Sequence, residues 1–281
     1  MKIAISIEST ADLTSEIIKD NDFKVVPFTI QLGDKSALDG EITTDEIIEF
    51  VNRNKILPKT SAINEFQYDE HFESILKEYD AIVHFSLSSQ MSLACTNARR
   101  AAEKFSNVYV VDSKSLSTGI ALLALYAKSL ADNGEEAKSI FEKCNERVPF
   151  VQASFALKRL DYLHKGGRCS SLTYFGANLL KIRPQILVKD GKMVTGKKYR
   201  GNYNNIIRNY CHDVLEEFDT PDLTCAFLTY TTASDEVLQT AKTALKEKGF
   251  KKIYVTRAGG TITSHCGEDC LGILYINDGN K

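Results

Sequence analysis

Short apolar runs alternate with amphipathic segments through the first 150 residues. Four runs rich in β-branched and aromatic residues are predicted to be strands, with Pro27 indicating an edge or a bulge in the second: 2–7, 23–32, 81–87 and 107–112. The segments between them show the periodicity of helices. We expect one short helix starting at 14–18 and longer ones at 44–54, 64–80, 90–105 and 117–134. This rhythm predicts an α/β fold with a mostly parallel, Rossmann-like sheet.

The pattern changes near Pro149. Apolar runs flank Asp190-Gly191, a dipeptide that favours a tight hairpin turn. Beyond the hairpin we expect helices at 203–218 and 234–248, and strands at 223–231, 251–257 and 271–277. We therefore predict two α/β domains, residues 1–150 and 151–281, the second with a mixed sheet and with a ligand held between the two.

Composition narrows the function classes. The 281-residue chain carries 35 Lys and Arg against 37 Asp and Glu, a formal net charge of −2, which argues against general nucleic-acid binding. Its seven cysteines are scattered without a CxxC pair, and no apolar run reaches transmembrane length. The apolar stretch at the start of the sequence is too short for a signal peptide. We expect a cytoplasmic protein with free thiols and no stable membrane insertion.

Hydroxyl side chains gather where the predicted strands end. Ser88, Ser89 and Ser92 follow the strand at 81–87, and Thr60 and Ser61 precede the helix at 64–80. In a parallel sheet the strand carboxyl ends face the ligand crevice, where the next helix offers unpaired N–H groups. A helix cap would explain one serine but not three. The sequence therefore predicts an anion site lined by hydroxyls.

Several familiar motifs are missing around these serines. There is no G-x-S-x-G elbow of a serine hydrolase, no glycine in IESTADL (7–13) to form a dinucleotide loop, and no P-loop. His265, Cys266 and Cys270 suggest zinc, but the C-x3-C spacing is loose and no second Cys/His pair lies nearby, so we expect no metal. We interpret 259–267 as a functional loop that carries His265.

Two basic clusters, at 165–168 and 197–201, stand out in a near-neutral chain. A solvated surface is the default interpretation of such clusters. If the fold brings Arg168 and Arg200 to His265, the three form a cationic rim suited to phosphate or to an acidic partner.

The ordered set of these motifs resembles that of the DegV family of bacterial fatty-acid-binding proteins. The matching stretches run the whole length of the chain: IESTADL (7–13), LDGEIT (38–43), Thr60-Ser61, SSQMSLA (88–94), VVDS (110–113), KGGR (165–168), KKYRG (197–201) and the segment ending at His265-Cys266-Gly267. Five positions in three of these stretches or next to them depart from the family pattern. Glu8 replaces an Asp, Ile63-Asn64 replaces Pro-Ser, and Leu93-Ala94 replaces Gly-Thr.

The resemblance implies a long-chain fatty acid held between two α/β domains, with no cofactor. Its carboxylate would be bound by hydroxyls of five residues: Thr60, Ser61, Ser88, Ser89 and Ser92. The resemblance also implies a separate ATP-dependent fatty acid kinase that converts the bound lipid to an acyl phosphate. Arg168, Arg200 and His265 match the positions that face this kinase.

The resemblance implies a role in lipid transport or fatty acid metabolism, and the energetics of burying an acyl chain agree with a lipid carrier. A sixteen-carbon chain buries ~14 methylenes at ~0.8 kcal/mol each, a gross gain of roughly 11 kcal/mol. Ordering the ligand takes back several kcal/mol. Two alternatives remain: a stand-alone hydrolase or phosphotransferase using Ser92 with His265, and a lipid sensor that passes no substrate on. The first predicts turnover without a partner, and the second predicts that no kinase consumes the bound lipid.

Overall fold

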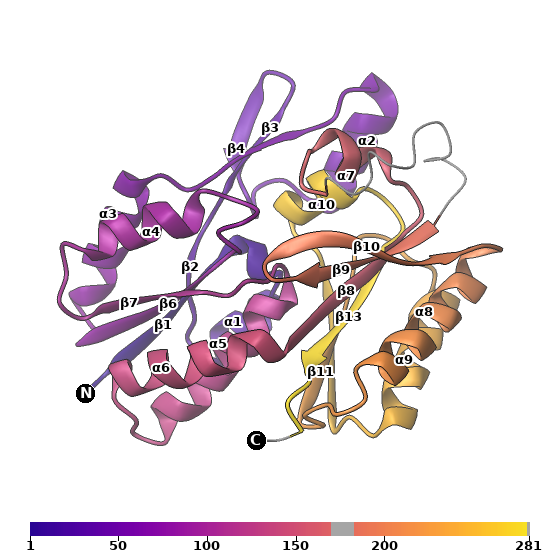
Figure 1. Ribbon diagram of the computed structural model, residues 1–281. Helices are drawn as coiled ribbons and strands as arrows, with labels where there is room; N and C mark the ends of the chain where they lie inside the picture. The colour runs from indigo at the N-terminus through magenta and orange to yellow at the C-terminus, as the bar shows by residue number, and fades with distance from the viewer. Residues whose placement is uncertain (170–182, 280–281) are drawn as a thin grey trace.

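The computed structural model describes residues 1–169 and 183–279, and its two larger sheets lie side by side (Figure 1). The N-terminal sheet has the order β2-β1-β6-β7, with every neighbouring pair parallel. Its strands are β1 (Ile3–Glu8), β2 (Lys24–Val26), β6 (Ala81–Ser86) and β7 (Val108–Asp112). β6 lies in the interior of the sheet and is fully buried, which explains why its sequence up to the serines is apolar except for the buried His84.

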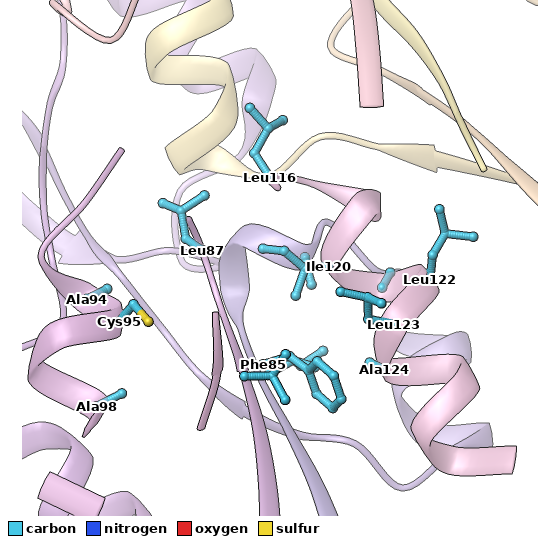
Figure 2. Packing of buried hydrophobic residues seen from close by; sticks show 14 of the residues in the cluster. Phe85, Leu87, Ala94, Cys95, Ala98, Leu116, Ile120, Leu122, Leu123 and Ala124 are labelled. Atoms are coloured by element: carbon cyan, nitrogen blue, oxygen red, sulfur yellow. The ribbon is translucent and has the colours of Figure 1, made fainter. Parts of the chain in front are cut away.

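Helices cover both faces of this sheet. Figure 1 shows one pair of helices on one face and another pair on the opposite face. These pairs are α3 (Glu65–Leu76) with α4 (Ala94–Ala102), and α5 (Thr118–Asp132) with α6 (Ala137–Arg147), while α1 (Ser15–Asp20) follows β1. Phe85 of β6 packs in one buried cluster with Ile120 and Leu123 of α5, as Figure 2 shows. Asn64, one of the departures from the family pattern, caps α3 through a reciprocal capping box with Gln67.

The C-terminal sheet has the order β10-β9-β8-β13-β11-β12. Its strands are β8 (Val151–Leu157), β9 (Arg183–Lys189), β10 (Lys192–Tyr199), β11 (Cys225–Tyr230), β12 (Lys252–Arg257) and β13 (Cys270–Ile276). β11 and β12 are parallel and the other pairs antiparallel. The helices α8 (Tyr203–Glu217) and α9 (Asp235–Lys248) pack against it, and α5 contacts β8 and β13. The predicted α/β class, with a parallel first sheet and a mixed second sheet, is confirmed.

The predicted hairpin is also confirmed. β9 and β10 pair across Asp190 and Gly191, which adopt left-handed φ angles of 50° and 79°. This conformation matches the twist of a two-residue hairpin turn. The hairpin tip reaches the serine segment after β6, because the Ser88 hydroxyl donates to the Gly191 carbonyl at 2.7 Å.

A third, antiparallel sheet was not predicted. It has the order β4-β3-β5 and consists of β3 (Thr29–Leu32), β4 (Lys35–Leu38) and β5 (Lys59–Ser61), with α2 (Thr44–Asn54) between the last two in sequence. The run at 23–32 is therefore divided at Pro27-Phe28 between two sheets. The prolyl nitrogen has no hydrogen to donate to a strand partner, so a break is favoured there.

Two further predictions need correction. The helix expected from residue 90 begins only at Ala94, and the expected loop at 259–267 contains α10 (Gly260–Cys266). The remaining short elements are η1 (Ser9–Ala11), η2 (Val148–Phe150) and α7 (Asp161–Lys165). The division into domains at residue 150 stays a prediction. Within 1–169 and 183–279, no helix combines the length and the apolar composition that a membrane span requires.

Candidate functional site

A cavity of about 260 Å³ lies between the carboxyl end of the N-terminal sheet and α10. Part of its wall is apolar and includes Phe28, Leu87, Met91, Leu116 and Ile262. Leu87 and Leu116 follow β6 and β7, and Figure 2 shows both side chains beyond the core residue Phe85, toward a neighbouring helix. The cavity therefore continues from the packed core at the end of the strands.

The rest of the wall carries polar groups. These belong to Thr60, Ser92, Arg168, Thr261 and His265. Four of the five, all but Thr261, are residues that the sequence singled out, although they lie on four separate parts of the chain. The fold thus brings Thr60, Ser92, Arg168 and His265 around one space.

His265 is the centre of this polar wall. Its Nε2 lies 2.8 Å from Thr60 Oγ1, and its Nδ1 is buried with no hydrogen-bond partner among the described residues. Burial, and secondarily the positive charge of Arg168, lowers the pKa of His265 to about 4. The ring is therefore neutral at neutral pH, and each nitrogen can act as a donor or an acceptor according to its tautomer.

The close approach of the α7 segment encloses the His265 ring. A Cβ atom added to Gly166 would lie 2.7 Å from His265 Nδ1, so a larger residue there would displace the ring. The exposed Arg168 side chain donates to the Gly166 carbonyl at 2.7 Å. The KGGR segment thus supplies both the space for the imidazole and a cation at the rim.

Ser92 lies in the turn that leads into α4. Its hydroxyl oxygen accepts from the Ala94 N–H at 3.2 Å, which leaves the hydroxyl hydrogen free to donate. The next residue, Leu93, is 69% exposed and lines the cavity, where the family pattern has a glycine. This substitution places an apolar side chain at the rim.

Ser88 and Ser89 have other partners. Ser88 is buried and donates to Gly191, while the Ser89 backbone N–H donates to Asp112 at 3.1 Å. The Ser89 hydroxyl accepts from Lys114 at 3.1 Å. These two serines hold the segment in which Ser92 lies, and neither lines the cavity.

Ser61 and Arg200 are exposed and lie outside the cavity wall. Ser61 follows Thr60 on β5, so its side chain points to the opposite face of the strand. Arg200 follows the end of β10.

Thr261 was missed by the sequence analysis. Its hydroxyl oxygen is buried without a hydrogen-bond partner in the part of the chain that the structure describes, and the residue lines the cavity. Thr261 and His265 are four residues apart on α10, the spacing that places two side chains on one helix face. A helical interpretation of 259–267 would have paired them.

A second unanticipated feature is the buried Glu8 carboxylate beneath the cavity. It accepts hydrogen bonds from the Leu87 N–H at 2.8 Å, from the Tyr68 hydroxyl at 2.6 Å, from Thr10 at 3.2 Å and from Ser86. Glu8 therefore fixes the backbone from which Leu87 enters the cavity wall. The extra methylene relative to the family's aspartate extends its reach to these donors.

The zinc alternative can be compared with the side-chain arrangement. Among the described residues, the group with metal-ligand proximity comprises His212, Asp213 and Glu216 on α8, and does not include His265, Cys266 or Cys270. Both Asp213 oxygens are already engaged, by Lys197 at 2.9 Å and by Tyr199 at 2.9 Å. A lysine ammonium in that position opposes cation binding.

Comparisons with known proteins agree with this architecture. Residues 2–278 match a protein-family model described as "Uncharacterised protein, DegV family". A DegV domain-containing protein of Clostridium acetobutylicum is 30% identical over 278 residues, 98% of each chain. The "Fatty acid-binding protein" of Thermotoga maritima is 29% identical over 281 residues, 97% of this chain and 96% of that protein.

A solved structure gives the same result. The crystal structure of DegV of Bacillus subtilis, described as a fatty acid binding protein, superposes with a TM-score of 0.86 at 25% identity. The match covers 99% of this chain and all of that one. The similarity therefore extends over both large sheets.

Proposed function

Because the chain belongs to the DegV family, we propose that it binds a long-chain fatty acid in the cavity between the N-terminal sheet and α10. The observation that carries the proposal is the composition of the wall. Apolar side chains line one part, and two buried polar atoms that have no partner among the described residues, Thr261 Oγ1 and His265 Nδ1, belong to residues of the other part. An amphipathic acid satisfies both parts at once.

The carboxylate would lie against Thr60 and Ser92. The Ser92 hydroxyl hydrogen is free to donate, and the Thr60 hydroxyl is oriented by His265 at 2.8 Å. Thr261 adds a third hydroxyl nearby on the wall. Neutral donors bind a carboxylate without a buried ion pair, so the acyl chain supplies affinity and the hydroxyls supply orientation.

The acyl chain would extend from the cavity toward the C-terminal sheet. A smaller pocket of about 20 Å³, walled by residues of both halves of the chain, shares Leu116, Ile262 and Cys266 with the main cavity. These three side chains separate the two spaces. The chain would pass them and widen the small pocket on binding.

We further propose that a separate ATP-dependent fatty acid kinase acts on the bound lipid and that the protein is not catalytic alone. Arg168 lies exposed at the cavity rim, where its charge would stabilise the phosphate that develops on the carboxylate oxygen. Arg200, exposed beyond β10, would contact the kinase or its nucleotide. The neutral His265 does not neutralise the carboxylate and leaves it nucleophilic.

The stand-alone enzyme alternative needs Ser92 to be paired with His265 as its base. The Nε2 atom of His265 pairs with Thr60, and its Nδ1 faces Gly166. This arrangement favours a carrier. Turnover of acyl esters or acyl phosphates by the protein alone, lost in Ser92→Ala, would establish the enzyme instead.

The decisive experiment is mass spectrometry of lipid released by denaturing the purified protein, followed by titration with oleate. A stoichiometric long-chain fatty acid, and at least tenfold weaker binding by a Thr60→Val/Ser92→Ala variant, are expected. Ser61→Ala is the matched control, because it removes the neighbouring exposed hydroxyl outside the cavity wall. A protein that is empty and does not take up oleate would refute the proposal.

The kinase step is tested separately. Arg168→Ala and Arg200→Ala should retain oleate binding and lose acyl phosphate formation in an assay with a bacterial fatty acid kinase and ATP. Loss of oleate binding in either variant would show that the arginine belongs to the lipid site instead.

A further inference from the structure

The amino end of α10 is held by two buried aspartate side chains from the first forty residues of the chain. Asp39 Oδ1 accepts from the Gly260 N–H at 2.8 Å, and Asp39 Oδ2 accepts from the Thr261 N–H at 3.2 Å. Asp12 Oδ1 accepts from the Gly259 N–H at 2.7 Å. The N–H groups of Gly259, Gly260 and Thr261 therefore all bind side chains that lie 221 to 247 positions earlier in the sequence.

Both aspartate side chains are themselves held in place. Ser9 donates to Asp39 Oδ2 at 3.0 Å, and Ser117 donates to Asp12. Asp12 is 3% exposed and Asp39 is 9% exposed, so water competes little for either. Each aspartate is therefore held by an N–H group at the start of α10 and also by a serine hydroxyl.

Two glycines make this approach possible. A Cβ atom on Gly260 would lie 2.2 Å from Ile30 Cδ1, and one on Gly259 would lie 3.2 Å from Asp12 Oδ1. A side chain at Gly260 would have to displace the Ile30 methyl group or move α10, and it would also crowd Asp39 Oδ1 at 3.1 Å. The glycine pair and the two aspartates therefore form one unit, which we call the α10 clamp: Asp12, Asp39, Gly259 and Gly260.

The clamp acts on the ligand site through α10. This helix has seven residues, too few to be stable by itself, and it supplies Thr261 and His265 to the cavity wall. Thr261 is also the residue whose N–H is bound by Asp39. A shift of the amino end would move both polar side chains relative to Thr60 and Ser92.

We propose that Asp39, supported by Asp12, is a positioning residue of the lipid site. This inference rests on the proposed function and assigns a role to two motifs, IESTADL (7–13) and LDGEIT (38–43), that contribute no residue to the cavity wall. They shape the site through backbone N–H groups of a distant helix. Their contribution is geometry rather than contact with the ligand.

An isosteric substitution separates the acceptor chemistry from the shape. Asp39 accepts from three donors. In Asp39→Asn one oxygen becomes an NH2 group, which cannot accept and faces an N–H of α10 in either orientation, because each Asp39 oxygen accepts from one of them. Asp45→Asn is the matched control, because Asp45 also joins the N-terminal half to the C-terminal sheet, through an exposed ion pair with Arg257, and does not contact α10 amides.

The experiment measures amide hydrogen exchange at 259–263 and the His265 ring resonances in lipid-free protein, and then the oleate dissociation constant. Asp39→Asn should speed exchange by about tenfold or more, shift the His265 resonances and weaken oleate binding about tenfold. Asp45→Asn should change the exchange rates and the oleate dissociation constant by less than about twofold and should leave the His265 resonances in place.

If Asp39→Asn does not fold, Asp12→Ala gives the same test. Asp12→Asn should lose less amide protection and less oleate affinity than Asp12→Ala. The reason is that its side-chain amide can accept from the Gly259 N–H and donate to the Ser117 oxygen. Unchanged exchange and unchanged His265 resonances in a folded Asp39→Asn or Asp12→Ala protein would overturn the positioning role. A wild-type protein that fails to bind oleate while these two signals still move would refute the proposed function and leave the clamp standing.

Discussion

The Glu8 carboxylate and the polar face of α10 lie on opposite sides of the cavity, and they differ in how fully their hydrogen bonds are formed. The nearby His84 Nε2, 3.8 Å from Glu8 Oε1, is buried without a partner among the described residues and is not one of the groups that bind the carboxylate. Beneath the cavity, the Glu8 carboxylate accepts from four donors, including Tyr68 and the Leu87 N–H. On α10, Thr261 Oγ1 and His265 Nδ1 are buried and have no partner in the described chain. Both clusters use ordinary polar residues, so residue type alone does not distinguish them.

This difference indicates which polar groups stabilise the fold and which ones are available to bind a ligand. A saturated buried cluster stabilises one conformation, because removing any member leaves a buried group unpaired. A buried group without a partner costs stability in the empty protein and regains it when a ligand supplies the partner. We therefore assign fold stability to Glu8 and ligand recognition to the polar face of α10.

Glu8→Gln tests the saturated cluster and should have the largest effect on the protein. The new amide nitrogen cannot accept, so at least one buried donor is left unpaired, and the free energy of unfolding should fall by about 2–4 kcal/mol. Urea denaturation measures this loss. Glu16→Gln, on the exposed surface of α1, is the control and should change stability by less than ~0.5 kcal/mol. A loss below ~1 kcal/mol in Glu8→Gln would contradict the assignment.

Asp12 offers a pH-dependent test on the α10 side. Burial raises the pKa of Asp12 from 3.8 to about 8, and the nearby charge of Asp39 adds to this, against the hydrogen bonds from Ser117 and Gly259 that lower it. The folded state therefore keeps a proton that the unfolded state releases. The stability contributed by this proton is complete below pH 3.8 and is lost as pH rises through about 8.

Asp12→Asn removes this titration. Its stability relative to the wild type should rise between pH 5 and pH 8.5, by on the order of a few kcal/mol at most. Urea denaturation of both proteins at the two pH values measures the difference. The hydrogen bond to Cys266, burial and, more weakly, the charge of Asp12 raise the pKa of Cys270, so Cys270→Ala serves as a second background in which the same pH dependence is expected. A pH-independent difference would show that Asp12 does not titrate in this range.

His265→Leu tests recognition. Removing both ring nitrogens should weaken oleate binding by about tenfold, or ~1.4 kcal/mol, while the free energy of unfolding at neutral pH changes by less than ~1 kcal/mol. Because the pKa of His265 is lowered to about 4, the wild type loses stability as pH falls from 6.5 toward 4, and the variant lacks this part of the loss. Calorimetric titration measures the oleate affinity, and urea denaturation measures the free energy of unfolding. A large stability loss without an affinity loss would reverse the assignment.

Thr261→Val should have the smallest effect and the most specific one. It removes only the unpartnered hydroxyl, so oleate affinity should fall about threefold to tenfold while stability stays equal or rises slightly. Thr263→Val on the same helix is the matched control, because its hydroxyl pairs with Thr44 at 3.2 Å. That variant should lose stability by about 1 kcal/mol and keep more of its affinity. Equal losses of affinity in both variants would remove the distinction.

Much of the fold was predictable because it is encoded locally. Period-two and period-3.6 patterns predicted both large sheets and most helices, and Asp190-Gly191 predicted its hairpin. α10 was not predictable in this way. Its Gly-Gly-Thr start has low helix propensity, and its N–H groups are bound by Asp39, which is 221 residues from Gly260 in sequence.

The sequence predicted the chemistry of the candidate site better than it predicted which residues line the cavity. Thr60, Ser92, Arg168 and His265 line the cavity, whereas Ser88 donates to Gly191 at 2.7 Å. Apolar wall residues were not distinguishable from core residues in the sequence. Phe28, for example, lies on the wall, and nothing in the sequence separates it from the core phenylalanines.

The sequence by itself determined the α/β class, the hydroxyl-rich strand ends and the membership of the family, because each of these depends on residue type and order along the chain. Only the tertiary structure decided which hydroxyls face the cavity and which polar atoms stay unpaired. Hydrogen-bond saturation depends on partners that are distant in sequence, such as Gly191 for Ser88 and Asp39 for Thr261. The sequence contains every hydrogen-bond donor and acceptor, but only the folded structure determines which of them are paired.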